Sequence, residues 1–407
     1  MYIHIGFIKN QLRLRKHLPT MQQDVGSILK HHRKEMGLTL EEGAEGICSV
    51  SYLSKVENNL IHPSDKYIAL FEEKFKVDLK DKPSRSEEDI TDFIINKHFY
   101  DEPIQVDLKF MSGLDYKSKL NQLMYLTITN QVERAKKQYM ELMPYIKNLN
   151  TKELKLFLYS MALLLTKEGR LKDAFSVLNL DMPYKMDCYL GCLMMKMRIM
   201  LATKMNNHPF ILLNYEQVVA YLIDHEYYHI AHELKYDYIV YLVQFITLEN
   251  LEYMLDKSLH LKDEQKKYVL ARYHFLNGSY EEAYPIIQGL ELYDINFYNL
   301  SIQILNKIGD KEALKKLISS QKYKDNIQMN LMSSYLNEKY FSRRLTTTSF
   351  IKNQIMKIND LPDMIDQLHF WYEESLENFK AHGFYKDATQ MGHLIYRKIR
   401  DLSLTEY

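Results

Sequence analysis

The residues whose spacing points most directly to chemistry lie in DHEYYHIAHE, residues 224–233. His225, Glu226 and His229 form the pattern His-Glu-x-x-His. When this pattern lies on a helix, the two histidines ligate zinc from one face and the glutamate activates a water molecule. A catalytic zinc site also needs a third protein ligand from outside that helix. The segment therefore predicts either a metal centre or an ordinary helix that matches the pattern by chance.

A third ligand is hard to find in the sequence. His232 continues the same predicted helix, with no glycine to turn the chain, so it does not converge easily on the ion. Glu249 and Glu252 have suitable chemistry, but no pattern marks either of them. We therefore favour the ordinary helix and predict no catalytic residue, no metal and no cofactor.

The composition favours long helices in a chain of 407 residues, because only 13 residues are glycine and 9 are proline. The formal net charge is zero, so bulk charge argues neither for nor against nucleic acid. Cys48, Cys188 and Cys192 give no disulfide framework, which suits a reducing compartment. No run of apolar residues is long enough for a membrane span. We expect a cytoplasmic protein with no membrane contact.

Apolar periodicity predicts a first helix from Asp24 that ends at Gly37 and buries one face. That face comprises Val25, Ile28, Leu29 and Met36. Thr39 and Glu42 form a predicted capping box at the start of a second helix, LEEGAEGI. Ser49 caps a third helix, whose apolar residues Val50, Leu53 and Val56 are expected to point inward. A fourth helix is expected to begin at Pro63 and Ser64, to bury Ile68, Phe71 and Phe75, and to end at Phe75.

Four short helices with a tight turn between the second and third describe a helix-turn-helix unit. The segment GLTLEEGAEGICSVSYLSKVENNLIHPS resembles the XRE-type helix-turn-helix of phage repressors and many bacterial regulators. Within it, EGICSVSYLSKVEN is similar to the version in the peptide-pheromone regulators named after Rgg, PlcR and NprR. Leu40 and Gly43 depart from the family pattern, and we expect both to weaken the second helix.

The resemblance implies that the third helix enters the DNA major groove and that the first helix meets phosphates. The candidate DNA-binding residues are Ser49, Ser51, Tyr52, Ser54 and Lys55 on the third helix, and Lys30, Arg33 and Lys34 on the first. In the family, a pair such as Arg33 and Glu57 also braces the two helices. Residues 21–82 carry nine Lys or Arg against eleven Asp or Glu, a net charge of −2. Because phosphate neutralisation drives DNA affinity, we expect a homodimer on a palindromic double-stranded operator.

The remainder of the chain, 90–407, shows helical periods broken by a recurrent turn. Each turn starts with Gly or Asn and ends in a small Ala, as in NQVERA at Ala135, GRLKDA at Ala174, GSYEEA at Ala283 and GFYKDA at Ala388. Glycine ends a helix in the left-handed conformation, and alanine lets the next helix pack closely. The pattern resembles a degenerate tetratricopeptide array of stacked helix pairs, which predicts an all-α superhelix. An unrelated helical bundle is the alternative.

A repeat array of this kind accompanies the helix-turn-helix in the family that the N-terminal segment resembles. The resemblance implies that a short signalling peptide binds the inner wall and resets a DNA-binding homodimer, as in quorum sensing. Side-chain amides suit the unpaired backbone of an extended peptide. The candidate peptide-binding residues, on the expected first helices of repeats, are Lys196, Tyr236, Arg272, Asn299 and Asn330.

The predicted organisation has four parts. Residues 1–20 are a basic N-terminal arm without fixed structure, or an upstream start before Met21. Residues 21–82 form the DNA-binding unit, 83–89 a linker, and 90–407 the repeat domain. Two other functions stay open: an XRE-type unit joined to an ImmA/IrrE-like zinc protease at His225, Glu226 and His229, and repeats that bind a protein partner.

Overall fold

The computed structural model describes residues 6, 8, 10, 25–58, 60–77, 79, 87–104, 116–180, 186–288, 295–320, 322–323, 326–341, 347–356 and 361–403. The predicted basic arm and the 83–89 linker lie largely outside these residues. The described residues are helical and include no strand, which confirms the predicted all-α class. None of the described helices is long and apolar enough to cross a membrane.

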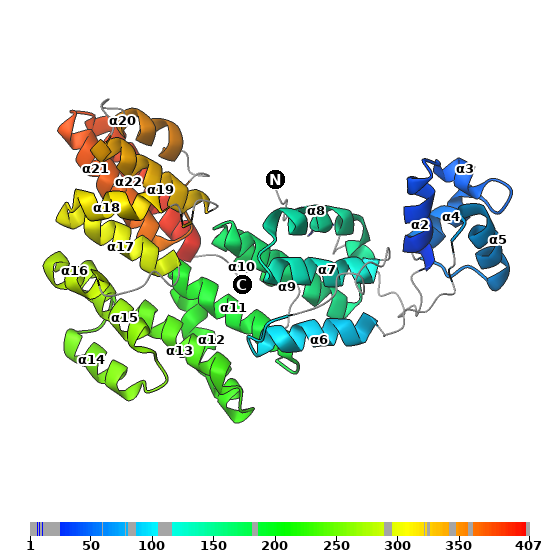
Figure 1. Cartoon of the computed structure of the whole chain (residues 1–407), viewed down its shortest axis with the longest axis horizontal. Helices are drawn as coiled ribbons and strands as arrows, with labels where there is room; N and C mark the ends of the chain where they lie inside the picture. The colour runs from blue at the N-terminus through cyan, green and yellow to red at the C-terminus, as the bar shows by residue number, and fades with distance from the viewer. Residues whose placement is uncertain are drawn as a thin grey trace. The chain divides into compact units, whose positions relative to one another are not determined.

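The chain divides into two compact units, Met1–Leu164 with Ser176–Met194, and Leu165–Phe175 with Met195–Tyr407. Four short helices near the N-terminus, blue in Figure 1, share one small core. They are α2 (Val25–Glu35), α3 (Leu40–Ala44), α4 (Val50–Glu57) and α5 (Asp65–Phe75). Their core contains Val25, Leu29, Ala44, Leu53, Val56, Phe71 and Phe75.

Local signals in the sequence explain where these four helices begin and end. Thr39 and Glu42 form the predicted capping box, and Ser49 caps α4 by accepting a hydrogen bond from the backbone N–H of Tyr52. Three details of the prediction are wrong. The second helix ends at Ala44, because Gly46 turns the chain at φ +76°. Met36 and Val50 were expected inside but are 47% and 40% exposed, because each lies at a helix end.

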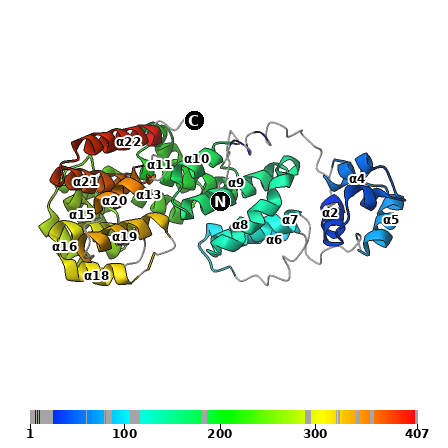
Figure 2. The ribbon, with the colours of Figure 1, turned by 90° about the horizontal axis from the view of Figure 1, so that it is seen from above.

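The other described helices follow along the chain. They are α6 (Glu87–Phe99), α7 (Tyr116–Ile128), α8 (Val132–Leu142), η2 (Met143–Asn148), α9 (Thr151–Lys167), α10 (Leu171–Leu178), α11 (Tyr189–Met205), α12 (His208–Asp224), α13 (Tyr228–Leu242), α14 (Leu248–Lys257), α15 (Asp263–Leu276), α16 (Tyr280–Gln288), α17 (Ile295–Ile308), α18 (Lys311–Ser319), α19 (Ile327–Phe341), α20 (Thr347–Phe350), η3 (Ile351–Ile355), α21 (Ile365–Ala381) and α22 (Tyr385–Ser403). Several consecutive ones pack as pairs, such as α7 with α8 and α17 with α18. The pairs α15–α16 and α21–α22 are packed side by side, the latter as in Figure 2.

The four predicted turn signals all lie between the two helices of a pair. Asn130, Gly169, Gly278 and Gly383 have φ between +61° and +80°, the left-handed conformation that ends a helix. In each case the next residue donates its N–H to a carbonyl five positions back, as Ser279 does to His274 at 2.8 Å. The alanine five residues after the turn is buried every time. The turn pattern therefore predicted the helix pairs correctly.

Candidate functional site

The His-Glu-x-x-His pattern does not lie on one helix, which corrects the expectation from the sequence. α12 ends at Asp224, His225 is its C-cap residue, and Glu226 has φ +62° before α13 begins at Tyr228. His225 and His229 therefore lie on opposite sides of a turn and do not form the helical zinc pair. Among the described residues, no three His, Cys, Asp or Glu side chains are grouped so that they could hold a metal ion. The protease alternative is not supported.

The segment around Glu226 is a further repeat turn. Glu226 stands where the other turns have Gly or Asn, and the N–H of Tyr227 donates to the Leu222 carbonyl at 2.8 Å. Ala231, five residues after Glu226, is fully buried, as in the four predicted turns. The Ala offset was visible in HEYYHIA, but the absence of Gly or Asn concealed the turn.

The five predicted peptide-binding residues lie on alternate helices, and they do not line one cavity. They are Lys196 on α11, Tyr236 on α13, Arg272 on α15, Asn299 on α17 and Asn330 on α19. Lys196 forms an ion pair with Glu233, and Asn299 is only 3% exposed, its side-chain oxygen accepting from the Gln303 amide at 3.2 Å. Asn299 thus serves packing in this structure, whereas Asn330 is exposed.

Asn330 lines a cavity of about 420 Å³ whose lining carries no charged side chain. The lining residues are Tyr298, Ile318, Ser319, Tyr323, Met329, Asn330, Ser333, Ser334 and Asn337. Asn330, Ser334 and Asn337 follow one another at four and three residues on α19, so they share one face of that helix. The cavity offers neutral donors and acceptors to a ligand. The sequence had suggested Asn330 but not Ser334 and Asn337, although their spacing was visible.

Tyr236 and Arg272 line a second, smaller cavity of about 50 Å³ together with Asp366. Arg272 is 9% exposed and donates two hydrogen bonds to the Asp366 carboxylate, the one from Nη2 to Oδ1 at 2.9 Å. Burial by itself lowers the pKa of Arg272, but the Asp366 carboxylate and Tyr268 outweigh it, so the pKa is raised. Arg272 is therefore a charged residue held inside the fold, and it does not present a free guanidinium to a ligand.

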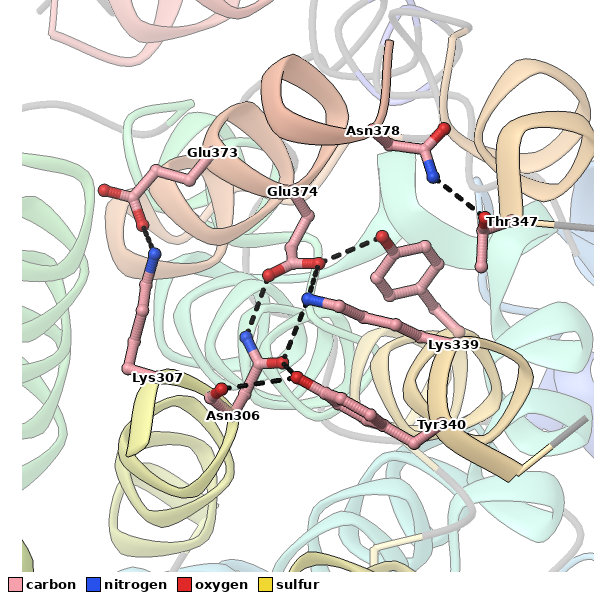
Figure 3. Close-up of polar contacts among 9 residues, drawn as sticks. Asn306, Lys307, Lys339, Tyr340, Thr347, Glu373, Glu374 and Asn378 are labelled. Atoms are coloured by element: carbon pink, nitrogen blue, oxygen red, sulfur yellow. Dashed lines mark hydrogen bonds and ion pairs between the residues drawn. The ribbon is translucent and has the colours of Figure 1, made fainter. Parts of the chain in front are cut away.

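A polar cluster that the sequence reasoning missed surrounds Glu374 of α21, as Figure 3 shows. The Glu374 carboxylate is 2% exposed and accepts from Asn306 at 2.8 Å, Tyr335 at 2.9 Å and Lys339 at 2.8 Å. Burial by itself lowers the pKa of Lys339. The adjacent Glu374 carboxylate outweighs this effect, so the pKa of Lys339 is raised overall. Burial and then Glu374 likewise raise the pKa of Tyr335.

In the N-terminal group, α2 and α4 are held together by a buried ion pair. Arg33 Nε donates to Glu57 Oε1 at 2.5 Å and Nη2 donates to Oε2 at 2.9 Å. Arg33 Nη1 also donates to the Leu38 carbonyl at 2.6 Å, and the side chains of the pair are 7% and 2% exposed. This confirms the predicted brace, and it removes Arg33 from the candidate phosphate contacts, because a buried and fully engaged guanidinium does not reach DNA.

Gly43 of α3 has a packing role that the sequence reasoning read as a weakness. A β-carbon built at Gly43 would lie 2.6 Å from Cδ of Arg33 and 3.1 Å from Cδ2 of Leu53. Glycine therefore lets α3 approach the braced α2–α4 pair more closely than any larger residue would.

A family model described as helix-turn-helix matches residues 29–82. Residues 29–82 form a helix-turn-helix domain. No curated protein matches the sequence. Among solved structures, the chain is similar to the apo form of the quorum sensor NprR from Bacillus thuringiensis, with 16% sequence identity and a TM-score of 0.46. The alignment covers 78% of this chain and 97% of the NprR chain. A second similar structure is Bacillus thuringiensis PlcR in complex with the peptide PapR7 and DNA, with 14% sequence identity and a TM-score of 0.24. That alignment covers 79% of this chain and 100% of the PlcR chain.

The helix-turn-helix domain exposes part of the predicted face of α4. Ser49, Ser51 and Lys55 are exposed, and Ser54 is half-buried. Tyr52 is half-buried, with its ring centroid 4.9 Å from that of Tyr67, and burial raises its pKa. Tyr52 therefore packs on α5 with one side of its ring.

On α2, which packs against α4, the two remaining candidate cations differ in exposure. Lys34 is exposed and Lys30 is half-buried. With Arg33 withdrawn into the core, Lys34 and Lys55 are the most accessible of the predicted basic residues in this domain.

Proposed function

We propose that this protein is a DNA-binding transcriptional regulator controlled by a short signalling peptide that binds its helical repeats. The observation that carries the DNA-binding part is the helix-turn-helix domain, in which α4 is capped by Ser49 and braced through Glu57. That bracing fixes α4 from the inside and leaves Ser51 and Lys55 free to face a major groove. Because its target is DNA, the regulator acts in the cytoplasm.

The charge of the domain favours a dimer on a two-fold operator. With nine basic residues against eleven acidic ones over residues 21–82, one domain makes few phosphate contacts. α4 contains no arginine, the residue that most often donates paired hydrogen bonds to guanine. Two domains on a palindrome double both the phosphate and the base contacts, so a homodimer reaches useful affinity where a single domain does not.

The cavity beside Asn330 supports the peptide-binding part. An extended peptide has backbone N–H and C=O groups that need partners when water is excluded. Asn330, Ser334 and Asn337 supply donors and acceptors on one face of α19 without any charge. A peptide that prefers one arrangement of the helix pairs shifts the regulator toward it, by as much as its affinities for the two arrangements differ.

The DNA part is tested by selecting bound duplexes from a random double-stranded library with the full-length protein. We expect a palindromic consensus and two chains per duplex by light scattering. Ser51→Ala with Lys55→Ala should weaken binding of the selected duplex about tenfold or more, because both base and phosphate contacts are lost. Lys386→Ala, an exposed lysine on α22, is the matched control and should bind as wild type. Unchanged affinity in the double variant, or one chain per duplex, would overturn the proposal.

A further inference from the structure

Three of the four carboxylates of helix α21 each form an ion pair with a cation on a different helix. The pairs are Asp366 with Arg272 on α15, Glu373 with Lys307 on α17 at 2.9 Å, and Glu374 with Lys339 on α19 at 2.8 Å. In a simple repeat stack, each repeat contacts only its neighbours. Two complete helix pairs separate α15 from α21 in the chain, so α21, which packs on its neighbours α20 and α22, also reaches helices beyond the neighbouring repeat.

Asp366 and Glu373 are seven residues apart, so two helical turns bring them to the same side of α21. Glu374 follows Glu373 and points about 100° further round the helix, so the three carboxylates form one acidic edge. Figure 3 shows Glu373 and Glu374 reaching toward α17 and α19 from this side. The match of carboxylate to cation is therefore repeated along the helix and is not a single chance pair.

Apolar residues of α21 are buried, and Phe370 and Trp371 contact Tyr335 of α19. Phe370, Trp371 and Phe379 are at most 3% exposed, and the Trp371 ring centroid lies 5.3 Å from that of Tyr335 on α19. The surface of α15, α17 and α19 under α21 thus combines aromatic contact area with three cations. Such a surface fits an amphipathic helix that has an acidic edge.

We infer that the wall of α15, α17 and α19 is a binding site for an acidic amphipathic helix of a partner protein, and that α21 is its internal occupant. α21 acts as an autoinhibitory strap, because the partner helix can bind this wall only after α21 has left it. The partner helix has carboxylates two turns apart beside an aromatic face, like those of α21. The site is separate from the cavity at Asn330, so the inference does not rest on peptide control.

Trp371, the single tryptophan of the chain, reports directly on the strap. Urea titration of the wild-type protein, followed by Trp371 emission and by far-UV circular dichroism, measures strap release and loss of helix separately. We expect the Trp371 transition at lower urea than the loss of helix, because the strap leaves before the stack unfolds. Coincident transitions would show that α21 is an ordinary core helix and would overturn the inference.

A second experiment tests whether a separate peptide with the sequence of α21 binds the exposed wall. The triple variant Asp366→Asn, Glu373→Gln, Glu374→Gln should raise hydrogen exchange in α21 and α22 about tenfold or more while α12 and α13 stay protected. A labelled synthetic peptide of Ile365–Ala381 should then bind this variant at least about tenfold more tightly than wild type, by fluorescence anisotropy. Glu377→Gln, an exposed carboxylate of the same helix, is the control and should behave as wild type.

A peptide with lysine at the three carboxylate positions should bind neither protein, because it places cations against Arg272, Lys307 and Lys339. If the native peptide fails to bind the released variant, or the reversed peptide binds equally well, the wall does not select an acidic helix and the inference is wrong.

Discussion

Glu226 occupies a left-handed backbone conformation at φ +62° that costs a residue with a β-carbon roughly 1–2 kcal/mol relative to glycine. Its neighbours His225 and His229 match a zinc motif in sequence only, because the turn at Glu226 separates them. A five-residue motif describes spacing along the chain, whereas metal chemistry depends on the backbone path between the ligands.

Replacing Glu226 with glycine should stabilise the protein. Glu226→Gly relieves the left-handed strain, and part of the gain is lost to the larger entropy of the unfolded chain. We expect the free energy of unfolding to rise by up to about 1 kcal/mol, measured by thermal or urea unfolding. Gly278→Ala, at φ +75° in an equivalent turn, should lower it by about the same amount. A loss of stability in Glu226→Gly would instead indicate a structural role for the glutamate side chain.

Local signals predicted the elements where the signal and its structural consequence lie within a few residues. The capping box at Thr39, the Ser49 cap and the turns at Gly169 and Gly278 are all of this kind. Exposure at the ends of helices was less predictable. Val50 has the right period to face the core, but it is the first residue of α4 and is 40% exposed. Periodicity gives the direction of a side chain, while the helix end decides whether anything covers it.

The contact between α13 and the α14–α15 turn should weaken at acidic pH. The rings of His232 and His260 stack with centroids 4.2 Å apart, near Lys235 and Lys266. The pKa of His232 is lowered by burial and then by Lys235, and that of His260 by burial and then by His232. Because folding lowers both values below 6.5, the folded state binds fewer protons, and stability is lost as the pH falls below about 6.5.

Melting temperatures measured between pH 8 and pH 5 test this contact. The wild-type protein should lose stability more steeply below pH 6.5 than His260→Asn, in which one of the two titrating rings is removed. The comparison must be made between the two proteins, since other histidines titrate in the same range. Identical slopes for the two proteins would mean that the stacked pair does not contribute.

Across the whole molecule, the sequence predicted a helix-turn-helix followed by helix pairs. It did not predict the contact between α21 and α15. Arg272 and Asp366 are 94 residues apart, and nothing in their local sequence marks them as partners. Arg272 was accordingly taken for a ligand contact, and the structure holds it in an ion pair. Asn299 was likewise predicted to face a ligand and is 3% exposed, because burial depends on which helices cover α17.

At the scale of the whole molecule, the proposed peptide binding should depend on the cavity at Asn330. Mass spectrometry of the protein purified from its host identifies the co-purifying peptide, and calorimetry then measures its affinity. Truncating an amide that pairs with the peptide backbone leaves a buried group unsatisfied, at a cost of roughly 1–3 kcal/mol. We therefore expect Asn330→Ala and Asn337→Ala each to weaken binding about tenfold or more. Asn353→Ala, an exposed amide on η3 away from the cavity lining, should bind as wild type. If both cavity variants bind the peptide normally, the peptide occupies another part of the repeats, and control of the DNA-binding domain must start there.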